Sequence, residues 1–185
     1  MAFNFDAPDL YVELARYSVE ELIGNNRYAT LPEGLPDDLL APGHGAFASL
    51  HRRGKLRGCI GTMEACQPCI GEEILHNARS AATRDPRFPA IKAVELDEIE
   101  YSVDVLTVPE PATIDQLDPK KFGVMVRHGG RCGVLLPDLD GVDTVDDQLS
   151  IACRKAGISV PFEELDVYRF EVVRHSAGGG SRAGV

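Results

Sequence analysis

The sequence lacks the features that mark membrane-spanning and exported proteins. Its 185 residues contain no apolar run that approaches the roughly 20 residues needed to cross a bilayer. The first residues, from Met1 to Asp6, show neither the basic region nor the apolar segment of a secretory signal. We therefore expect a cytoplasmic protein that does not associate with membranes.

Positive charge is also scarce. The formal net charge is −10, and an acidic protein is repelled by phosphate backbones unless its basic residues are gathered in one patch. The densest basic stretch begins at His51 and includes Arg52, Arg53, Lys55 and Arg57. It spans a predicted hairpin turn and is too short to form such a patch. No nucleic-acid partner is expected.

Cysteine is limited to five residues, an odd number that argues against a disulfide framework. In a reducing cytoplasm these residues are thiols. The five histidines are scattered without the spacing of a metal pair. The sequence also contains no glycine-rich phosphate loop, nucleophile elbow or dinucleotide fingerprint. We therefore predict no cofactor and no metal.

The remaining composition is that of a folded protein. Hydrophobic residues make up 44% of the chain, which is normal for a globular domain and too high for a disordered one. A chain of this length buries a sizeable core without disulfides. We predict one domain over residues 1–175 and a disordered, glycine-rich tail over 176–185.

Periodic patterns predict helices and strands in alternation. Both halves of the sequence show a hairpin followed by a helix, without regular βαβ spacing, so we expect an α+β fold with antiparallel pairing. Both hairpins should lie in one sheet, with the helices that follow them packed on it. The expected elements are a helix after Asp9, a hairpin at about 46–61, a helix at 68–85, a strand at 99–105, a hairpin at 122–136, a helix after Thr144 and a strand at 167–173.

The thiol with the most distinctive surroundings is Cys59, which lies between Gly58 and Gly61 near the end of a predicted strand. Glycines permit close approach by a ligand or by another backbone. Cys59 is therefore a candidate nucleophile, or alternatively a small buried hydrophobic residue. Arg57 lies two residues away on the same strand and should share its face. It is either an anion-binding residue or a solvated arginine.

Two further thiols form the motif Cys66-Gln67-Pro68-Cys69 at a predicted helix N-terminus. Such a position favours a thiolate. With Cys59 and His76 the motif offers four soft ligands, but the helix begins inside the motif and separates them. Incidental cysteines are the preferred interpretation, and redox activity remains the alternative.

Polar residues that follow this motif are weaker candidates. Asp85 and Arg87 flank Pro86, and an arginine–carboxylate pair at such a place often fixes a turn, so a structural clamp is the favoured interpretation of Asp85. Glu100 and Asp104 project from one face of a predicted strand with Ser102 between them. Two carboxylates at this spacing suit acid–base chemistry, although such a face is more often simply solvated.

Five blocks in the sequence resemble the AMMECR-type family, which is known in prokaryotes as AmmeMemoRadiSam system protein A. The first is the heptad Leu56-Arg57-Gly58-Cys59-Ile60-Gly61-Thr62, which is similar to the family signature. The blocks occur in order over about residues 10–173. The other four blocks start at Asn77, Tyr101, Gly133 and Cys153. The block that starts at Asn77 includes Asp85-Pro86-Arg87-Phe88-Pro89.

The resemblance implies a fold of two hairpin-and-helix repeats around a barrel-like antiparallel sheet. It also implies partners, namely a Memo-type protein related to extradiol dioxygenases and a radical-SAM enzyme. It supports Cys59 as a catalytic residue of an enzyme or enzyme subunit, and a non-catalytic module that docks these partners is the alternative. The residues predicted to bind a small-molecule substrate are Arg57, Gly58, Gly61, Thr62, Asn77 and Arg87.

Overall fold

The computed structural model describes residues 2–42, 45–176 and 182–183. The chain forms two compact units. The first unit is Met1–Val105 with Arg174–Ser181, and the second is Leu106–Val173 with Arg182–Val185. In the sequence, the second unit is therefore inserted near the end of the first.

The helices of the first unit follow local signals in the sequence. Helix α1 (Leu10–Asn25) begins where the Asp9 carboxylate accepts hydrogen bonds from the N–H groups of Tyr11 and Val12, and it ends at Asn26 in the left-handed conformation. Helix α3 (Ile70–Thr83) begins after Cys69, two residues later than Pro68 suggested. A short helix α2 (Asp37–Leu40) and a 3-10 helix η1 (Ala93–Glu98) also form.

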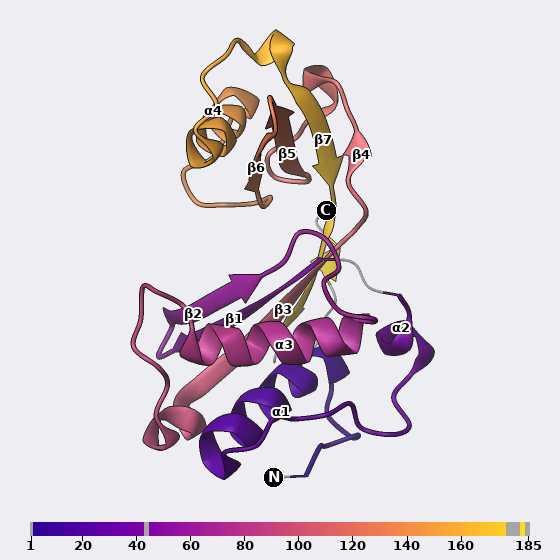
Figure 1. Cartoon of the computed structure of the whole chain (residues 1–185), viewed down its shortest axis with the longest axis vertical. Helices are drawn as coiled ribbons and strands as arrows, with labels where there is room; N and C mark the ends of the chain where they lie inside the picture. Colours follow the sequence, from indigo (N-terminus) through magenta and orange to yellow (C-terminus); the bar gives the residue numbers. More distant parts are fainter. Residues whose placement is uncertain (1, 43–44, 177–181, 184–185) are drawn as a thin grey trace. The chain divides into compact units, whose positions relative to one another are not determined.

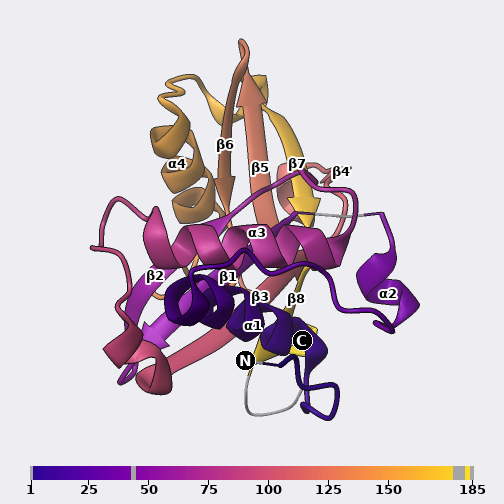
Figure 2. The same cartoon turned by 60° about the horizontal axis from the view of Figure 1, so that its bottom comes forward.

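The first unit contains an antiparallel sheet in which the strands β2 (Lys55–Gly61), β1 (Ala46–Arg52), β3 (Ile99–Leu106) and β8 (Val172–Ser176) lie in this order. Helix α3 runs across β1 and β2 (Figure 2). Apolar side chains that alternate along the strands meet apolar stripes of α1 and α3. The most completely buried include Leu14, Val19, Leu50, Ile74, Leu75 and Val103.

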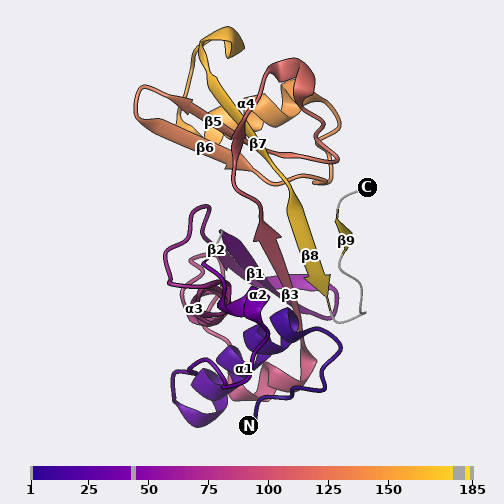
Figure 3. The ribbon, with the colours of Figure 1, turned by 90° about the vertical axis from the view of Figure 1, so that its right-hand side faces the viewer.

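The second unit repeats this construction. Its sheet has the order β4 (Glu110–Pro111), β7 (Asp166–Phe170), β5 (Gly123–His128) and β6 (Arg131–Leu135). Helix α4 (Val145–Ala156) lies against one face of this sheet (Figure 3). The helix is capped by Thr144, as the sequence predicts, and it ends at Gly157, whose φ of 64° lies in the left-handed region that favours glycine. The 3-10 helices η2 (Ile114–Gln116) and η3 (Phe162–Glu164) complete the unit.

The α+β class and both hairpins are confirmed, but the single sheet is wrong. The hairpins β1–β2 and β5–β6 belong to different antiparallel sheets, and neither sheet, as far as the structure describes the chain, closes into a barrel. The predicted strand at 167–173 is interrupted at Glu171. Its two parts, β7 and β8, join different sheets.

A pair of glycines marks the same packing in both units. A side chain at Gly58 of β2 would lie 2.3 Å from the Ala81 carbonyl of α3, and one at Gly133 of β6 would lie 2.1 Å from the Ala152 carbonyl of α4. In each unit a helix backbone therefore approaches the second strand of a hairpin more closely than any other residue allows. This shared contact supports the predicted repeat of hairpin and helix.

The C-terminal segment is only partly described. Ser176, the first residue of the predicted tail, ends β8, and Arg182–Ala183 form the short strand β9. The remainder of the predicted tail lies outside the described residues. Among the helices of the described chain, none has the length and apolar character to span a bilayer.

Candidate functional site

Cys59 lies on β2, with its side chain on the sheet face opposite to α3. Its neighbour Gly58 faces Ala81 of α3, and successive strand residues point to opposite faces. Cys59 pairs with Ser49 of β1, whose hydroxyl donates to the sulfur across 3.2 Å. Ser49 in turn pairs with Ser102 of β3. The half-buried thiol therefore belongs to a row of small polar side chains across three strands.

The backbone of Cys59 is held from outside the sheet. Its N–H donates to Oδ2 of Asp85 at 2.9 Å, and its carbonyl accepts from Nη2 of Arg87 at 3.3 Å. Asp85 and Arg87 also bind each other, through Nε at 3.0 Å and Nη2 at 2.7 Å. These hydrogen bonds from Arg87 hold the pKa of the buried Asp85 carboxyl well below its usual range. The two side chains act as the predicted clamp, and they bind the backbone of the candidate thiol.

Arg57 was predicted to share a sheet face with Cys59 because side chains alternate along a strand, but the alternation is interrupted at Arg57. Leu50 pairs with Gly58, whereas His51 pairs with Leu56, so Arg57 is an extra residue in β2. Such a bulge redirects side chains. The guanidinium binds both carboxylate oxygens of Glu95, at 3.0 and 3.1 Å. It also donates to the backbone carbonyls of residues 89 and 90. The carboxylate that Arg57 binds in this structure is therefore supplied by the protein itself.

The chain's own atoms occupy the spaces beside the two signature glycines. The Ala81 carbonyl lies over Gly58, and the ring of Phe47 lies over Gly61, where a side chain would meet ring carbons at 2.2 Å. Packing therefore explains both glycines without a ligand. Their assignment to substrate binding remains a prediction.

Thr62 and Asn77 meet at a buried carboxylate that the sequence did not single out. Glu73 of α3 is fully buried and accepts from the Thr62 hydroxyl and, at 3.3 Å, from Asn77 Nδ2. It also accepts from the backbone N–H groups of Cys66 and Gln67, at 2.8 Å each. The network anchors the loop after β2 to α3. Glu73 follows Glu72 in an amphipathic helix, and nothing in this pattern shows that its carboxylate accepts hydrogen bonds from the preceding loop.

The two cysteines of the CxxC motif differ in exposure. Cys66 is exposed, whereas Cys69 is buried at the N-cap of α3, and both are free thiols. The described residues contain no grouping of three or more histidine, cysteine or acidic side chains suited to a metal. The interpretation of these cysteines as incidental remains a prediction.

The two carboxylates predicted to share a face of β3 differ in burial and in partners. Asp104 is buried and binds Arg174 of β8 through Nε at 2.8 Å and Nη2 at 3.1 Å. Glu100 is exposed at the far end of the strand. Asp104 therefore has a structural partner, and it adds a charged pair to the face that carries Cys59.

Cys59 and the two residues that clamp it do not line the two cavities described next. One of about 370 Å³ lies in the first unit, between α1 and the start of β3, and one of about 340 Å³ lies in the second unit beside Phe122 and Arg169. In the second unit Arg169 stacks on Phe122, with 4.5 Å from the guanidinium carbon to the ring centre. Cys59 and the residues predicted to bind substrate line neither cavity, whereas Glu100 lines the one in the first unit.

The fold and the site define an α+β protein with two sheet-and-helix units and a clamped, half-buried thiol on one sheet face. A model of the AMMECR1 family matches residues 12–175. The chain therefore belongs to the AMMECR1 family, and the resemblance seen in the sequence is confirmed.

Individual relatives are similar over nearly the whole chain. A protein from Thermotoga maritima is 46% identical over 167 residues, which cover 89% of this chain and 96% of that protein. Protein CA_C1420 from Clostridium acetobutylicum is 45% identical over 90% of this chain, but the match covers only 36% of that longer protein. The crystal structure of the uncharacterized protein PH0010 from Pyrococcus horikoshii matches with a TM-score of 0.79 and 30% identity, over 94% of each chain.

Proposed function

We propose that this protein is an enzyme subunit of a modification pathway and that Cys59 is its reactive thiol. The observation that carries the proposal is the geometry around this residue. Its backbone is fixed on both sides by Asp85 and Arg87, while its side chain lies half-buried on a polar sheet face. Reactive thiols occupy partly exposed positions near positive charge, and productive geometry requires a rigid support.

The other predicted residues have distinct parts in this proposal. Arg87 has the most exposed side chain of the group, at 55%, so its guanidinium is the one placed to meet an anionic substrate group. Arg57, Thr62 and Asn77 position the edge strand and the loop that follows it. Gly58 and Gly61 allow the close packing that fixes the strand.

The proposed partners are a Memo-type protein and a radical-SAM protein. The support is the family resemblance, together with the Clostridium relative, in which a domain similar to this chain is joined to a larger amount of other sequence. Fusion in one protein is a common outcome for domains that act together. Co-purification of the full chain with the two partner proteins from the same genome tests this proposal, followed by a metabolite screen of each protein alone and of all three together.

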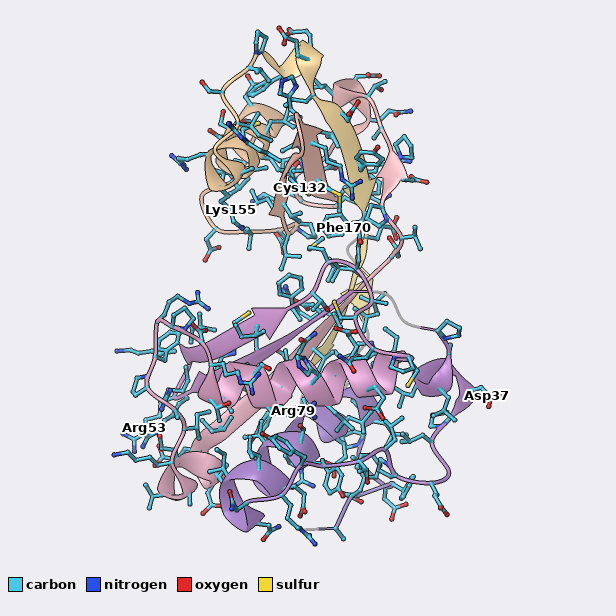
Figure 4. The ribbon with its side chains drawn as sticks, viewed as in Figure 1. Asp37, Arg53, Arg79, Cys132, Lys155 and Phe170 are labelled. Atoms are coloured by element: carbon cyan, nitrogen blue, oxygen red, sulfur yellow. The ribbon has the colours of Figure 1, made fainter. Side chains whose placement is uncertain are left out.

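Site-resolved labelling with iodoacetamide tests the thiol. At pH 7 we expect Cys59 to be alkylated faster than each of the other four cysteines. Cys66 and Cys132 are internal controls because both are more exposed than Cys59. Cys132 belongs to the second unit (Figure 4). Exposure alone would make these two react first, so a faster Cys59 requires activation by its surroundings.

A pair of variants links the rate to the clamp. Arg87→Ala should slow alkylation of Cys59 because it removes the nearby positive charge. Arg84→Ala should leave the rate unchanged, since Arg84 is an exposed arginine at the end of α3. Thermal unfolding of both variants verifies that they are folded. If Cys59 stays unlabelled until the protein unfolds, it is not the reactive thiol.

A non-catalytic module that docks the same partners is the second candidate. The observation in its favour is that the protein's own atoms fill the spaces beside Gly58 and Gly61, so these glycines need no ligand to explain them. Cys59→Ala separates the two functions. A docking module retains partner binding and pathway product with this variant, whereas an enzyme subunit retains binding and loses the product.

A further inference from the structure

Helix α1 and strand β3 belong to the first unit (Figure 1). Residues of α1 and of the start of β3 line a cavity, and Cys59 is not among its lining residues. Its volume is about 370 Å³, which is within the range of small-molecule sites. Its inner walls are apolar and include Val12 of α1, Leu96 of η1 and Ile99 of β3, with the ring of Tyr101 beside them. Apolar walls of this kind accommodate the body of a small organic molecule.

The charge at this cavity has one predominant sign. Five carboxylates line it, against one arginine, Arg16. That arginine already binds Glu13 through Nε at 2.7 Å and Glu20 through Nη1, so it is not available to an anion. Two of the carboxylates, Asp97 and Glu100, belong to exposed residues. The field of the cavity therefore attracts cations and repels anions.

One buried group in the cavity wall has no partner. Tyr101 is only 6% exposed, and its hydroxyl makes no hydrogen bond in the structure. Burial and the nearby Glu20 carboxylate raise the pKa of Tyr101 well above its usual range, so the hydroxyl is neutral and can both donate and accept. An unsatisfied buried hydroxyl is costly. Its place in the wall of a cavity indicates that a bound molecule supplies the partner.

We propose that this cavity binds a small organic cation, a primary ammonium on an apolar body of a few carbons. The apolar body lies against Val12, Leu96 and Ile99, and the ammonium donates to the Tyr101 hydroxyl and to a rim carboxylate such as Glu100. A metal ion fits less well, because Arg16 already occupies the oxygens of Glu13 and Glu20 that face it. The site is independent of the chemistry proposed for Cys59.

Nuclear magnetic resonance titration of the full, isotope-labelled chain tests the site with n-hexylammonium as the probe. The amides of Leu96, Glu100 and Tyr101 should shift, and rising salt should weaken the binding. Two molecules of equal chain length are the chemical controls, neutral 1-hexanol and anionic hexanoate. We expect hexylammonium to bind at least about tenfold more tightly than either one, because only the cation gains from the acidic rim.

Three variants locate the contacts. Tyr101→Phe keeps the ring and removes the hydroxyl, and it should weaken hexylammonium binding about fivefold. Glu100→Gln should weaken binding and reduce its salt dependence. Glu163→Gln removes a carboxylate that is also exposed but belongs to the second unit, and it should change nothing. Equal binding of 1-hexanol, unchanged binding by Tyr101→Phe, or the absence of shifts at these amides would each overturn the proposal.

Discussion

At the scale of single residues, Gly58 shows how tightly a strand and a helix are packed. Alanine at this position would place its Cβ 2.3 Å from the Ala81 carbonyl, a backbone atom that cannot turn aside. We expect Gly58→Ala to lower the free energy of unfolding by about 3 kcal/mol. Gly24→Ala is the matched control, because the nearest side-chain atom there lies 3.8 Å away. It should be neutral or slightly stabilising. Urea denaturation of both variants measures the difference.

The unpartnered hydroxyl of Tyr101 leads to a prediction about the stability of the protein without a bound molecule. If no group satisfies it, Tyr101→Phe removes a desolvation cost and should raise the free energy of unfolding by about 1 kcal/mol. Tyr11→Phe provides the contrast, since the Tyr11 hydroxyl donates to Asp38 at 2.9 Å. That variant should be destabilised. A destabilised Tyr101→Phe would show that the hydroxyl already has a partner in the free protein.

The sequence indicated candidate site residues and gave little information on their contacts. The signature indicated Cys59, and Pro86 between Asp85 and Arg87 indicated a clamp, because these signals are local. Glu73 and Glu95 gave no such signal. Glu73 binds Thr62, Cys66 and Gln67, which lie 6 to 11 residues away in the sequence. Glu95 binds Arg57, which lies 38 residues away. Only the folded chain brings these residues together.

At the scale of elements, the segment from Asp85 to Glu95 completes the edge strand β2. An exposed edge offers unpaired N–H and C=O groups to other chains. Here Asp85 and Arg87 occupy the N–H and C=O of Cys59, and Glu95 binds the guanidinium of the bulged Arg57. Side chains thus replace a further strand at this edge.

Glu95 makes the stability of this edge depend on pH. The hydrogen bonds from Arg57 lower its pKa from 4.5 to about 2. A carboxyl whose pKa is lowered by folding stabilises the protein above its unfolded pKa, and the contribution is lost as pH falls through its folded pKa. The stability difference between the natural protein and Glu95→Gln should therefore be constant above about pH 5 and shrink from about pH 4.5 to 2.

Chemical denaturation at a series of pH values measures this difference. Arg57→Ala is the control. Without Arg57 the pKa of Glu95 should be lowered less, so the stability difference should shrink less between pH 4.5 and 2 in that background. A difference that stays the same from pH 5 to 2.5 would contradict the assignment of this ion pair.

Element boundaries were predictable where a cap or a turn marks them. Asp9 and Thr144 each mark the start of a helix in the sequence and cap that helix in the structure. The interruption at Glu171 was not predictable, because neither glycine nor proline marks it and apolar residues continue on both sides. The bulge at Arg57 was missed for a different reason. Gly58 beside it was interpreted as a place of close approach and not as the sign of a bulge, so the true direction of the guanidinium was missed as well.

At the scale of the whole molecule, the chain builds two cores rather than one. One buried cluster uses residues up to Val103, and the other lies between Leu117 and Val167. The prediction of a single sheet failed because alternation shows which face of a strand is buried and does not show which strand lies beside it. The repeated hairpin and helix was visible in the sequence, but its division into two sheets depends on long-range pairing.

Separate cores lead to a prediction about unfolding. Leu149 of α4 and Leu75 of α3 are both completely buried, one in each cluster. Truncation of either to alanine should cost about 3 kcal/mol. Because the two clusters share no residue, we expect Leu149→Ala to accelerate amide hydrogen exchange in β5, β6 and α4 while leaving α1, α3 and β1 protected. Leu75→Ala should produce the reverse pattern. Equal acceleration throughout the chain by either variant would mean that both cores unfold as one cooperative unit. The strands β3 and β8 would then be the first elements to test for this coupling, because each crosses the boundary between the units in the sequence.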